Sequence, residues 1–115
     1  MKQSYIKIKP LTVNQVWKGR RFKTAKYKDY ENELMWLLGK NRIPSGKLKL
    51  EMEVGLSSKL ADVDNILKPF IDVLQKKYQF NDRDIYEINI TKSIVKKGEE
   101  FIKWRIKKWK SQKIK

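Results

Sequence analysis

Residues 48–56 read LKLEMEVGL, which is the clearest strand pattern in the chain. Apolar side chains occupy every second position, and lysine or glutamate fills the positions between them. Because successive side chains of a strand point to opposite faces of a sheet, this period of two predicts a strand with one buried face. The polar face is expected to meet water or a partner, and the core face comprises Leu48, Leu50, Met52, Val54 and Leu56.

A helix is expected on each side of this strand. The first begins after Thr24 as N-cap and stops near Gly39, and its core stripe comprises Tyr27, Tyr30, Leu34, Leu37 and Leu38. The second runs from about Asn65 to Tyr78, with Pro69 near its first turn, where a missing N–H costs little. Its buried face comprises Leu67, Phe70, Ile71, Leu74 and Tyr78.

Three further strands complete the expected fold. They cover SYIKIKP at 4–10, IYEINITKSIV at 85–95 and EFIKWRIKKW at 100–109, and the last two are expected to form a hairpin around Gly98. The order β-α-β-α-β-β predicts a single α+β domain over residues 1–115, with two helices on a mostly antiparallel or mixed sheet. Residues 108–115 are expected to form a basic tail, either on DNA or in solvent.

Charge and composition narrow the function. Lysine and arginine total 28 against 13 acids, and the net charge of +15 favours a polyanionic partner, with nucleic acid the leading candidate. The chain has no cysteine or histidine, which excludes disulfides, thiol nucleophiles, zinc sites of thiolate or imidazole, and serine–histidine triads. No stretch approaches the roughly 18 apolar residues of a membrane span and no signal peptide is evident, so a cytoplasmic protein is expected.

The loop LTVNQVWKGRRFKT at 11–24 mixes cations with aromatic side chains, as nucleic-acid contacts do. The alternative is a solvated basic loop beside two core aromatics. The candidate DNA-binding residues are Asn14, Trp17, Lys18, Arg20, Arg21 and Lys23.

Acids gather at DVDNILKPFID, residues 62–72. Asp62 and Asp64 fall at the start of the second helix, and Lys68 and Asp72 follow at spacings of four, one turn apart on its surface. These residues, with Asn65, could act only as caps, first-turn residues and a surface ion pair. However, a cap needs only one acid, and two close carboxylates repel each other unless a cation joins them.

A third acidic group, Asp82 with Asp84, precedes the strand at 85. The return from the second helix is expected to bring Asp82 near Asp62 and Asp64. Three carboxylates without a soft ligand favour Mg²⁺ or Mn²⁺. An EF-hand is a poor fit, because the sixth position counted from Asp62 is Leu67 and not glycine. Such a metal, with a neighbouring lysine, predicts phosphodiester hydrolysis.

The pattern D-x-D-N-x-x-x-K, a helix and then an aspartate before a strand resembles the RusA family of Holliday junction resolvases, and KPLTVNQVWKGRR is similar to that family's basic opening. The resemblance spans about residues 4–107. It implies a small homodimeric, Mg²⁺-dependent endonuclease, with one active site per subunit, that nicks opposing strands of a four-way junction. By position, Asp62, Asp64 and Asp82 would bind the metal, and Lys68 would contact the scissile phosphate.

One departure from that family concerns the third ligand. The family usually has two adjacent acids before this strand, whereas this chain has Asn81 and Asp82 followed by Asp84. Alignment through Phe80 and Ile85 assigns the role to Asp82, leaving Asp84 as a substitute and Asp72 and Asn65 as supporting residues.

Two questions stay open at this point. A non-catalytic basic module that binds DNA or RNA is the alternative function, and Trp36, Trp104 and Met35 could belong either to a dimer interface or to the core. No small-molecule cofactor is expected, and the resemblance is compatible with a bacterial, phage or prophage origin.

Overall fold

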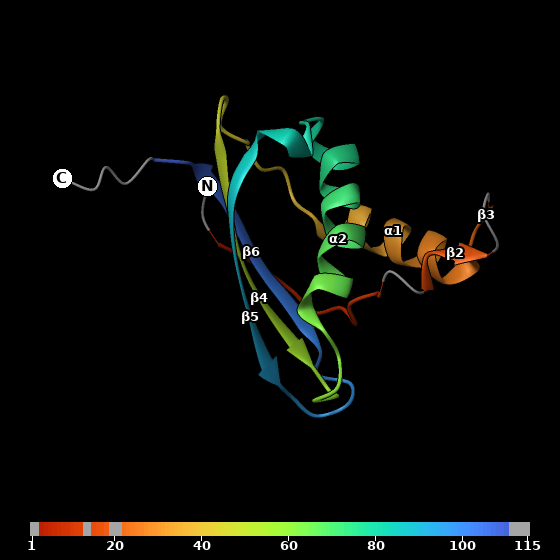
Figure 1. Cartoon of the computed structure of the whole chain (residues 1–115). Coiled ribbons are helices and arrows are strands. Elements are labelled where there is room, and N and C mark those ends of the chain that lie inside the picture. The colour runs from red at the N-terminus through yellow and green to blue at the C-terminus, as the bar shows by residue number, and fades with distance from the viewer. Residues whose placement is uncertain (1–2, 13–14, 19–21, 111–115) are drawn as a thin grey trace.

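The computed structural model describes residues 3–12, 15–18 and 22–110 (Figure 1). Its elements confirm the α+β prediction with two helices, and a short hairpin, β2–β3, lies within the predicted loop. No helix in the described ranges is long and apolar enough to cross a membrane. In chain order the elements are β1 (Ser4–Ile6), β2 (Trp17–Lys18), β3 (Phe22–Lys23), α1 (Ala25–Leu37), β4 (Leu48–Leu56), α2 (Val63–Tyr78), the 3₁₀ turn η2 (Asp82–Asp84), β5 (Ile85–Ile94) and β6 (Phe101–Lys108).

The main sheet is mixed, with the strand order β1-β6-β4-β5. β4 lies inside it, antiparallel to β6, where Met52 is opposite Trp104, and parallel to β5, where Met52 is opposite Ile90. The predicted hairpin around Gly98 is therefore wrong. β5 and β6 take opposite edges of the apolar strand β4, and the chain crosses the end of β4 between them, turning at Gly98 with a φ of +94°.

Helix α1 begins as the sequence predicts. The Thr24 hydroxyl accepts a hydrogen bond from the Tyr27 N–H at 3.1 Å, which satisfies one of the donors left free at a helix start. Tyr27, Tyr30, Leu34 and Leu38 are buried, but Leu37 is exposed and its predicted core position is wrong. Leu37 and Leu38 lie on opposite sides of the stripe, and only the Leu38 side meets the core.

Helix α2 begins at Val63 instead of about Asn65, so Pro69 lies in its second turn and not near its first. The Asn65 carbonyl therefore has no partner at position 69. The buried face is also centred differently from the prediction, because it meets the core on the side of Ile66 and Val73, and Leu67 and Tyr78 are only partly buried. The buried residues are Ile66, Pro69, Phe70, Ile71, Val73 and Leu74.

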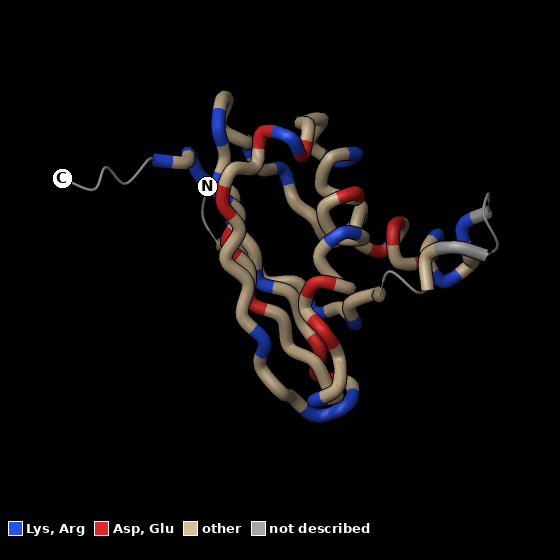
Figure 2. Tube along the Cα trace, in the orientation of Figure 1, with Lys and Arg blue, Asp and Glu red and all other residues tan. Residues whose placement is uncertain are grey.

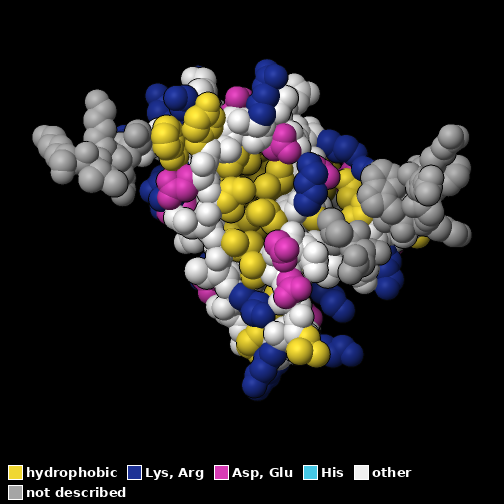
Figure 3. All heavy atoms as spheres, viewed as in Figure 1, with side chains coloured by type: hydrophobic (Ala, Val, Ile, Leu, Met, Phe, Trp, Pro, Cys, Tyr) yellow, Lys and Arg dark blue, Asp and Glu magenta, His cyan; other side chains and the backbone are white. Residues whose placement is uncertain are grey.

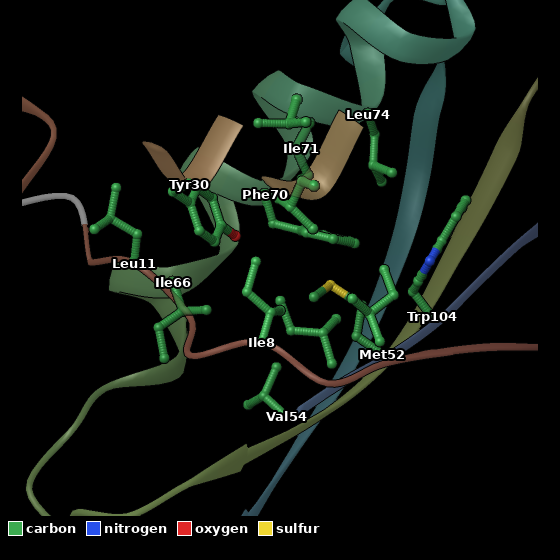
Figure 4. Close-up of a cluster of buried hydrophobic side chains, with 14 of the residues drawn as sticks. Ile8, Leu11, Tyr30, Met52, Val54, Ile66, Phe70, Ile71, Leu74 and Trp104 are labelled. Carbon is green, nitrogen blue, oxygen red and sulfur yellow. The ribbon is translucent and has the colours of Figure 1, made fainter. Parts of the chain in front are cut away.

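The core lies between the sheet and the two helices, which cover one face of it (Figures 1 and 4). Trp104 is fully buried there and Met35 packs against the core cluster, whereas Trp36 is 89% exposed. The residues labelled in Figure 4 show how the N-terminal segment, the sheet and both helices all contribute: Ile8, Leu11, Tyr30, Met52, Val54, Ile66, Phe70, Ile71, Leu74 and Trp104.

The opposite face of the sheet carries a ladder of ion pairs. Glu51 binds Arg105 at 2.6 Å and Lys107 at 3.4 Å, and its neighbours on β4 pair with β5 and β6. These further pairs are Lys49 with Glu87 and Glu53 with Lys103. Beyond β6, the Trp109 N–H donates to the Lys47 carbonyl at 2.9 Å, and residues 111–115 of the predicted tail lie outside the described ranges.

Candidate active site

Two exposed carboxylates stand at the start of α2. Asp62 occupies the N-cap position with an extended backbone, φ −92° and ψ 134°, yet its side chain makes no capping hydrogen bond. Asp64 is exposed in the first turn and accepts a hydrogen bond from the Asn65 N–H at 3.1 Å. Neither carboxylate forms an ion pair with any described residue. Helix capping alone therefore does not account for this pair.

Lys68 lies one turn further along α2, between two other carboxylates. Its Nζ is 2.7 Å from Asp72 Oδ1 and 3.3 Å from Asp82 Oδ2. The hydrogen bond to Asp72 raises the pKa of Lys68, and Asp82 adds to this rise, so the amine stays protonated at neutral pH. Figure 2 shows acidic and basic positions following one another along α2.

Asp82 is held against the helix by η2. Its backbone N–H donates to Gln75 Oε1 at 2.8 Å, and the Asn81 side chain begins the turn by accepting from the Arg83 N–H at 3.0 Å. Asp82 thus returns to α2 as expected, but to Lys68 rather than to the pair at the helix start. Asp84, at the other end of η2, is partly exposed, and its backbone N–H donates to the Asn81 carbonyl.

The donor set suits a hard cation in part. Across residues 3–12, 15–18 and 22–110, no three acidic side chains are close enough to hold one metal ion. Mg²⁺, however, keeps several waters and binds through one or two carboxylates together with substrate phosphate oxygens. Asp62 and Asp64 are two carboxylates of the kind that Mg²⁺ prefers, and Asp82 is paired with Lys68.

The loop before Asp62 is fixed by a lysine that sequence reasoning missed. Lys92 Nζ donates to the carbonyls of Lys59 at 3.1 Å and Ala61 at 2.9 Å, which ties β5 to the approach to α2. The signal was present, because Lys92 interrupts a run of isoleucines at alternate positions of β5. A lysine among these isoleucines indicates that its ammonium group binds a particular acceptor.

A buried carboxylate anchors the start of the same loop. Glu100 is the one buried charged side chain among the described residues; it accepts from the Ser57 hydroxyl at 3.0 Å and the Gly98 N–H at 2.8 Å. Its own backbone N–H, together with these donors, lowers the pKa of its carboxyl despite burial. A cavity of about 320 Å³, lined in part by Lys9, Ser57 and Glu100, opens beside this anchor.

The predicted DNA-binding residues belong to a separate part of the molecule. β2 and β3 form an antiparallel hairpin before α1, and Figure 1 shows it far from β5. Lys23 Nζ lies 4.3 Å from the centre of the Tyr27 ring. Trp17 and Lys18 are in β2, whereas Asn14, Arg20 and Arg21 lie outside the described ranges.

Comparison with protein families places most of the chain in one of them. The family model described as Endodeoxyribonuclease RusA matches residues 8–107, which include both helices, β4, η2 and β5. A search of curated proteins finds no match.

Proposed function

The chain belongs to the RusA family of endodeoxyribonucleases, and we propose that it resolves four-way DNA junctions by paired symmetric nicks. The reaction would be Mg²⁺-dependent hydrolysis of phosphodiesters, with Mn²⁺ as a substitute. The observation that carries the proposal is the exposed pair Asp62 and Asp64 at the start of α2, where Asp62 makes no capping hydrogen bond and Asp64 lies one turn before Lys68.

The metal would be held by Asp62 and Asp64, with Asp82 as the third carboxylate and Asp84 as its substitute. When bound, it would polarise the phosphodiester and lower the pKa of a coordinated water. The Asp82 carboxylate accepts a hydrogen bond from Lys68, so an incoming phosphate that takes Lys68 would free this carboxylate for the metal.

Lys68 would contact the scissile phosphate. Its ammonium is exposed, and its raised pKa keeps it charged throughout the neutral range. Asp72 would hold the lysine in place before and after the phosphate arrives. A fixed cation aimed at the site of developing negative charge stabilises that charge more than it stabilises the ground state.

The basic hairpin region would hold the arms of the junction. Cations there would contact phosphates while aromatic rings stack on bases or sugars, and a homodimer would offer one such region to each half of the substrate. The residues proposed for these contacts are Asn14, Trp17, Lys18, Arg20, Arg21 and Lys23.

A non-catalytic DNA- or RNA-binding module remains the second candidate. It is favoured by the finding that no three carboxylates converge among the described residues. In that case Asp62 and Asp64 would serve only the helix dipole.

A labelled synthetic four-way junction separates the two. We expect paired nicks at symmetric positions with wild type and Mg²⁺, none in EDTA, and a loss of at least about 10³-fold with Asp64→Asn, because one metal ligand is gone. Asp29→Asn, an exposed aspartate on α1, is the matched control and should cleave normally. A junction that shifts on a native gel but stays intact with wild type and Mg²⁺ would support the binding module.

A further inference from the structure

Lys92 lies on the face of β5 that is turned toward the helices. In register it is opposite Val54 of β4, which is fully buried on that face, and Ile90 and Ile94 stand two residues before and after it. Figure 3 shows hydrophobic side chains gathered in a hollow between β5 and α2, with charged side chains at its rim. A lysine can reach such a rim because its long apolar stem covers the sheet while its ammonium stays in water. The charged end of Lys92 is therefore on the same side of the sheet as Asp62.

The ammonium of Lys92 fixes two peptide groups just before α2. It donates to the carbonyls of Lys59 at 3.1 Å and of Ala61 at 2.9 Å. Because a peptide group is planar, the Ala61 carbonyl and the Asp62 nitrogen belong to one rigid unit. The contact therefore restrains the backbone of Asp62 itself, from a lysine that follows Ala61 by 31 residues.

Asp62 depends on this restraint more than Asp64 does. Asp64 is inside α2, whose backbone hydrogen bonds hold it, whereas Asp62 is at the N-cap, where the backbone is still extended. The Asp62 side chain makes no capping hydrogen bond, so the helix does not orient its carboxylate. How the two carboxylates face each other thus depends on the loop at 57–61.

The two ends of this loop are held by different residues. At its start, the Ser57 hydroxyl donates to the buried carboxylate of Glu100 at 3.0 Å. At its end, Lys92 is the one described side chain that hydrogen-bonds to Ala61. Loss of Lys92 would therefore release the residues next to Asp62 and leave the beginning of the loop in place.

We propose that Lys92 is a positioning residue for the metal site, and this inference rests on the proposed function. By holding the peptide group before Asp62, it keeps the carboxylates of Asp62 and Asp64 turned toward the same ion. Its carbonyl partners are uncharged, so the ammonium also keeps its positive charge near the site. The two effects have opposite signs. Removing the hold weakens the binding of a divalent cation, whereas removing the charge alone strengthens it.

Amide hydrogen exchange tests the hold without metal, DNA or activity. Lys92→Met keeps the apolar stem and loses both hydrogen bonds. The amides of Leu60 and Ala61, which donate to Ser58 at 3.2 and 3.5 Å, should then exchange about tenfold faster. Lys92→Arg still has donors for both carbonyls and should restore most of the protection. Lys49→Met, which removes a sheet lysine paired with a carboxylate instead, should leave these amides unchanged. Unchanged exchange in Lys92→Met would refute the inference whether or not the protein cuts DNA.

Binding of Mn²⁺ to the free protein, followed by electron paramagnetic resonance, tests the link to the site. We expect Lys92→Met to weaken binding by about 10–100-fold, the usual loss when a group that supports a metal ligand is removed. Lys92→Arg and Lys49→Met should bind as wild type does. Equal or tighter binding by folded Lys92→Met would overturn the inference alone, because only the charge would then matter. A wild type that binds no Mn²⁺ would overturn the proposed function and the inference with it, so the wild-type protein distinguishes the two failures.

Discussion

The ammonium group of Lys68 is placed where it could also bind a phosphate group of DNA. Its ammonium satisfies Asp72 and Asp82 at once, and more than half of its side chain is exposed to solvent. Replacing it removes a positive charge at the proposed site and leaves the two carboxylates to repel each other. Its effect on cleavage should therefore exceed its effect on DNA binding.

We expect Lys68→Gln to lower the cleavage rate at saturating junction by about 10²–10³-fold, the loss seen when one fixed donor to developing charge is removed. Junction affinity at the same salt should change by less than about tenfold, since one of many phosphate contacts is lost. Single-turnover kinetics with a native gel measure both. Lys76→Gln is the control, because Lys76 is also exposed on α2 but pairs with Glu31. Equal losses in both variants would count against the role of Lys68.

Glu100 makes stability depend on pH. Its folded pKa lies below the ordinary value of 4.5, so its contribution is fully present above that value and is lost as the pH falls through the folded pKa. Glu100→Gln should therefore reduce the free energy of unfolding at neutral pH by about 1–2 kcal/mol. The gap to wild type should narrow as the pH falls to about 3.

Urea unfolding at the two pH values checks this prediction. Glu99→Gln, at the exposed neighbouring glutamate, should match wild type at both. A gap for Glu100→Gln that stays constant with pH would mean that the lost contact is not one of charge.

At the scale of single residues, the sequence predicts contacts within one helix better than contacts between distant segments. The i,i+4 relation of Lys68 and Asp72 follows from helix geometry alone and is found at 2.7 Å. Other contacts depend on how β5 and β6 return to β4. These are the ion pair of Lys68 with Asp82 and the hydrogen bonds of Lys92 and Glu100 to the loop before α2. Local periodicity holds no information on that return.

At the scale of the elements, β4 and β6 make a close contact at Gly55, which lies opposite Phe101. A Cβ atom there would lie 2.3 Å from Cε1 and 2.4 Å from Cδ1 of Phe101, whose ring covers the strand and stacks on Tyr5 at 5.3 Å between centroids. An aromatic ring over a strand glycine is a recognised device of sheet construction. Side-chain space, and not backbone freedom, explains this glycine.

Gly55→Ala should therefore destabilise the protein by about 1–3 kcal/mol, the usual effect of added volume at a packed position. Thermal unfolding followed by far-ultraviolet circular dichroism measures it. Gly39→Ala is the matched control, because no heavy atom lies within 4 Å of the Cβ position there, and its effect should be small. A neutral Gly55→Ala would show that the Phe101 ring moves aside freely.

Elements were predicted where one local rule decides them. The alternation of 48–56 and the N-cap at Thr24 are both confirmed. The start of α2 was placed too late because the apolar stripe was counted from Leu67, whereas Ile66 is buried and the helix begins at Val63. The hairpin β2–β3 is too short to produce a period.

At the scale of the whole molecule, some of the positive charge is neutralised by ion pairs on one face of the sheet. On the face of the sheet away from the helices, four cations form ion pairs with glutamates of β4 and β5. These cations are Lys49, Lys103, Arg105 and Lys107. The chain's remaining excess must therefore lie elsewhere, including the basic region around β2 and β3. This distribution supports placing the DNA contacts away from the face of the sheet that carries these ion pairs.

The element order and the mixed sheet were predicted correctly, but the pairing of β5 with β6 was not, for a physical reason. The patterns of β5 and β6 describe two strands joined by a turn, and a hairpin is the shortest connection. Both strands instead pair with β4, since its two edges lie beside the apolar core and α2 supplies the crossover that parallel pairing needs. Which edge a strand takes is settled by the competition for burial.

The strand order also governs when this protein can first exist as a folded molecule. β1 pairs only with β6, so the first strand to leave the ribosome must wait for residues 101–108 before it finds its neighbour. The unit β4–α2–β5 can assemble earlier, but without Ile102, Trp104 and Ile106 its core is incomplete. Non-local pairing of this kind slows folding. A nascent chain that carries residues 62–82 but not β6 therefore lacks a complete core, and the proposed site has no stable fold to hold it until synthesis has passed residue 108.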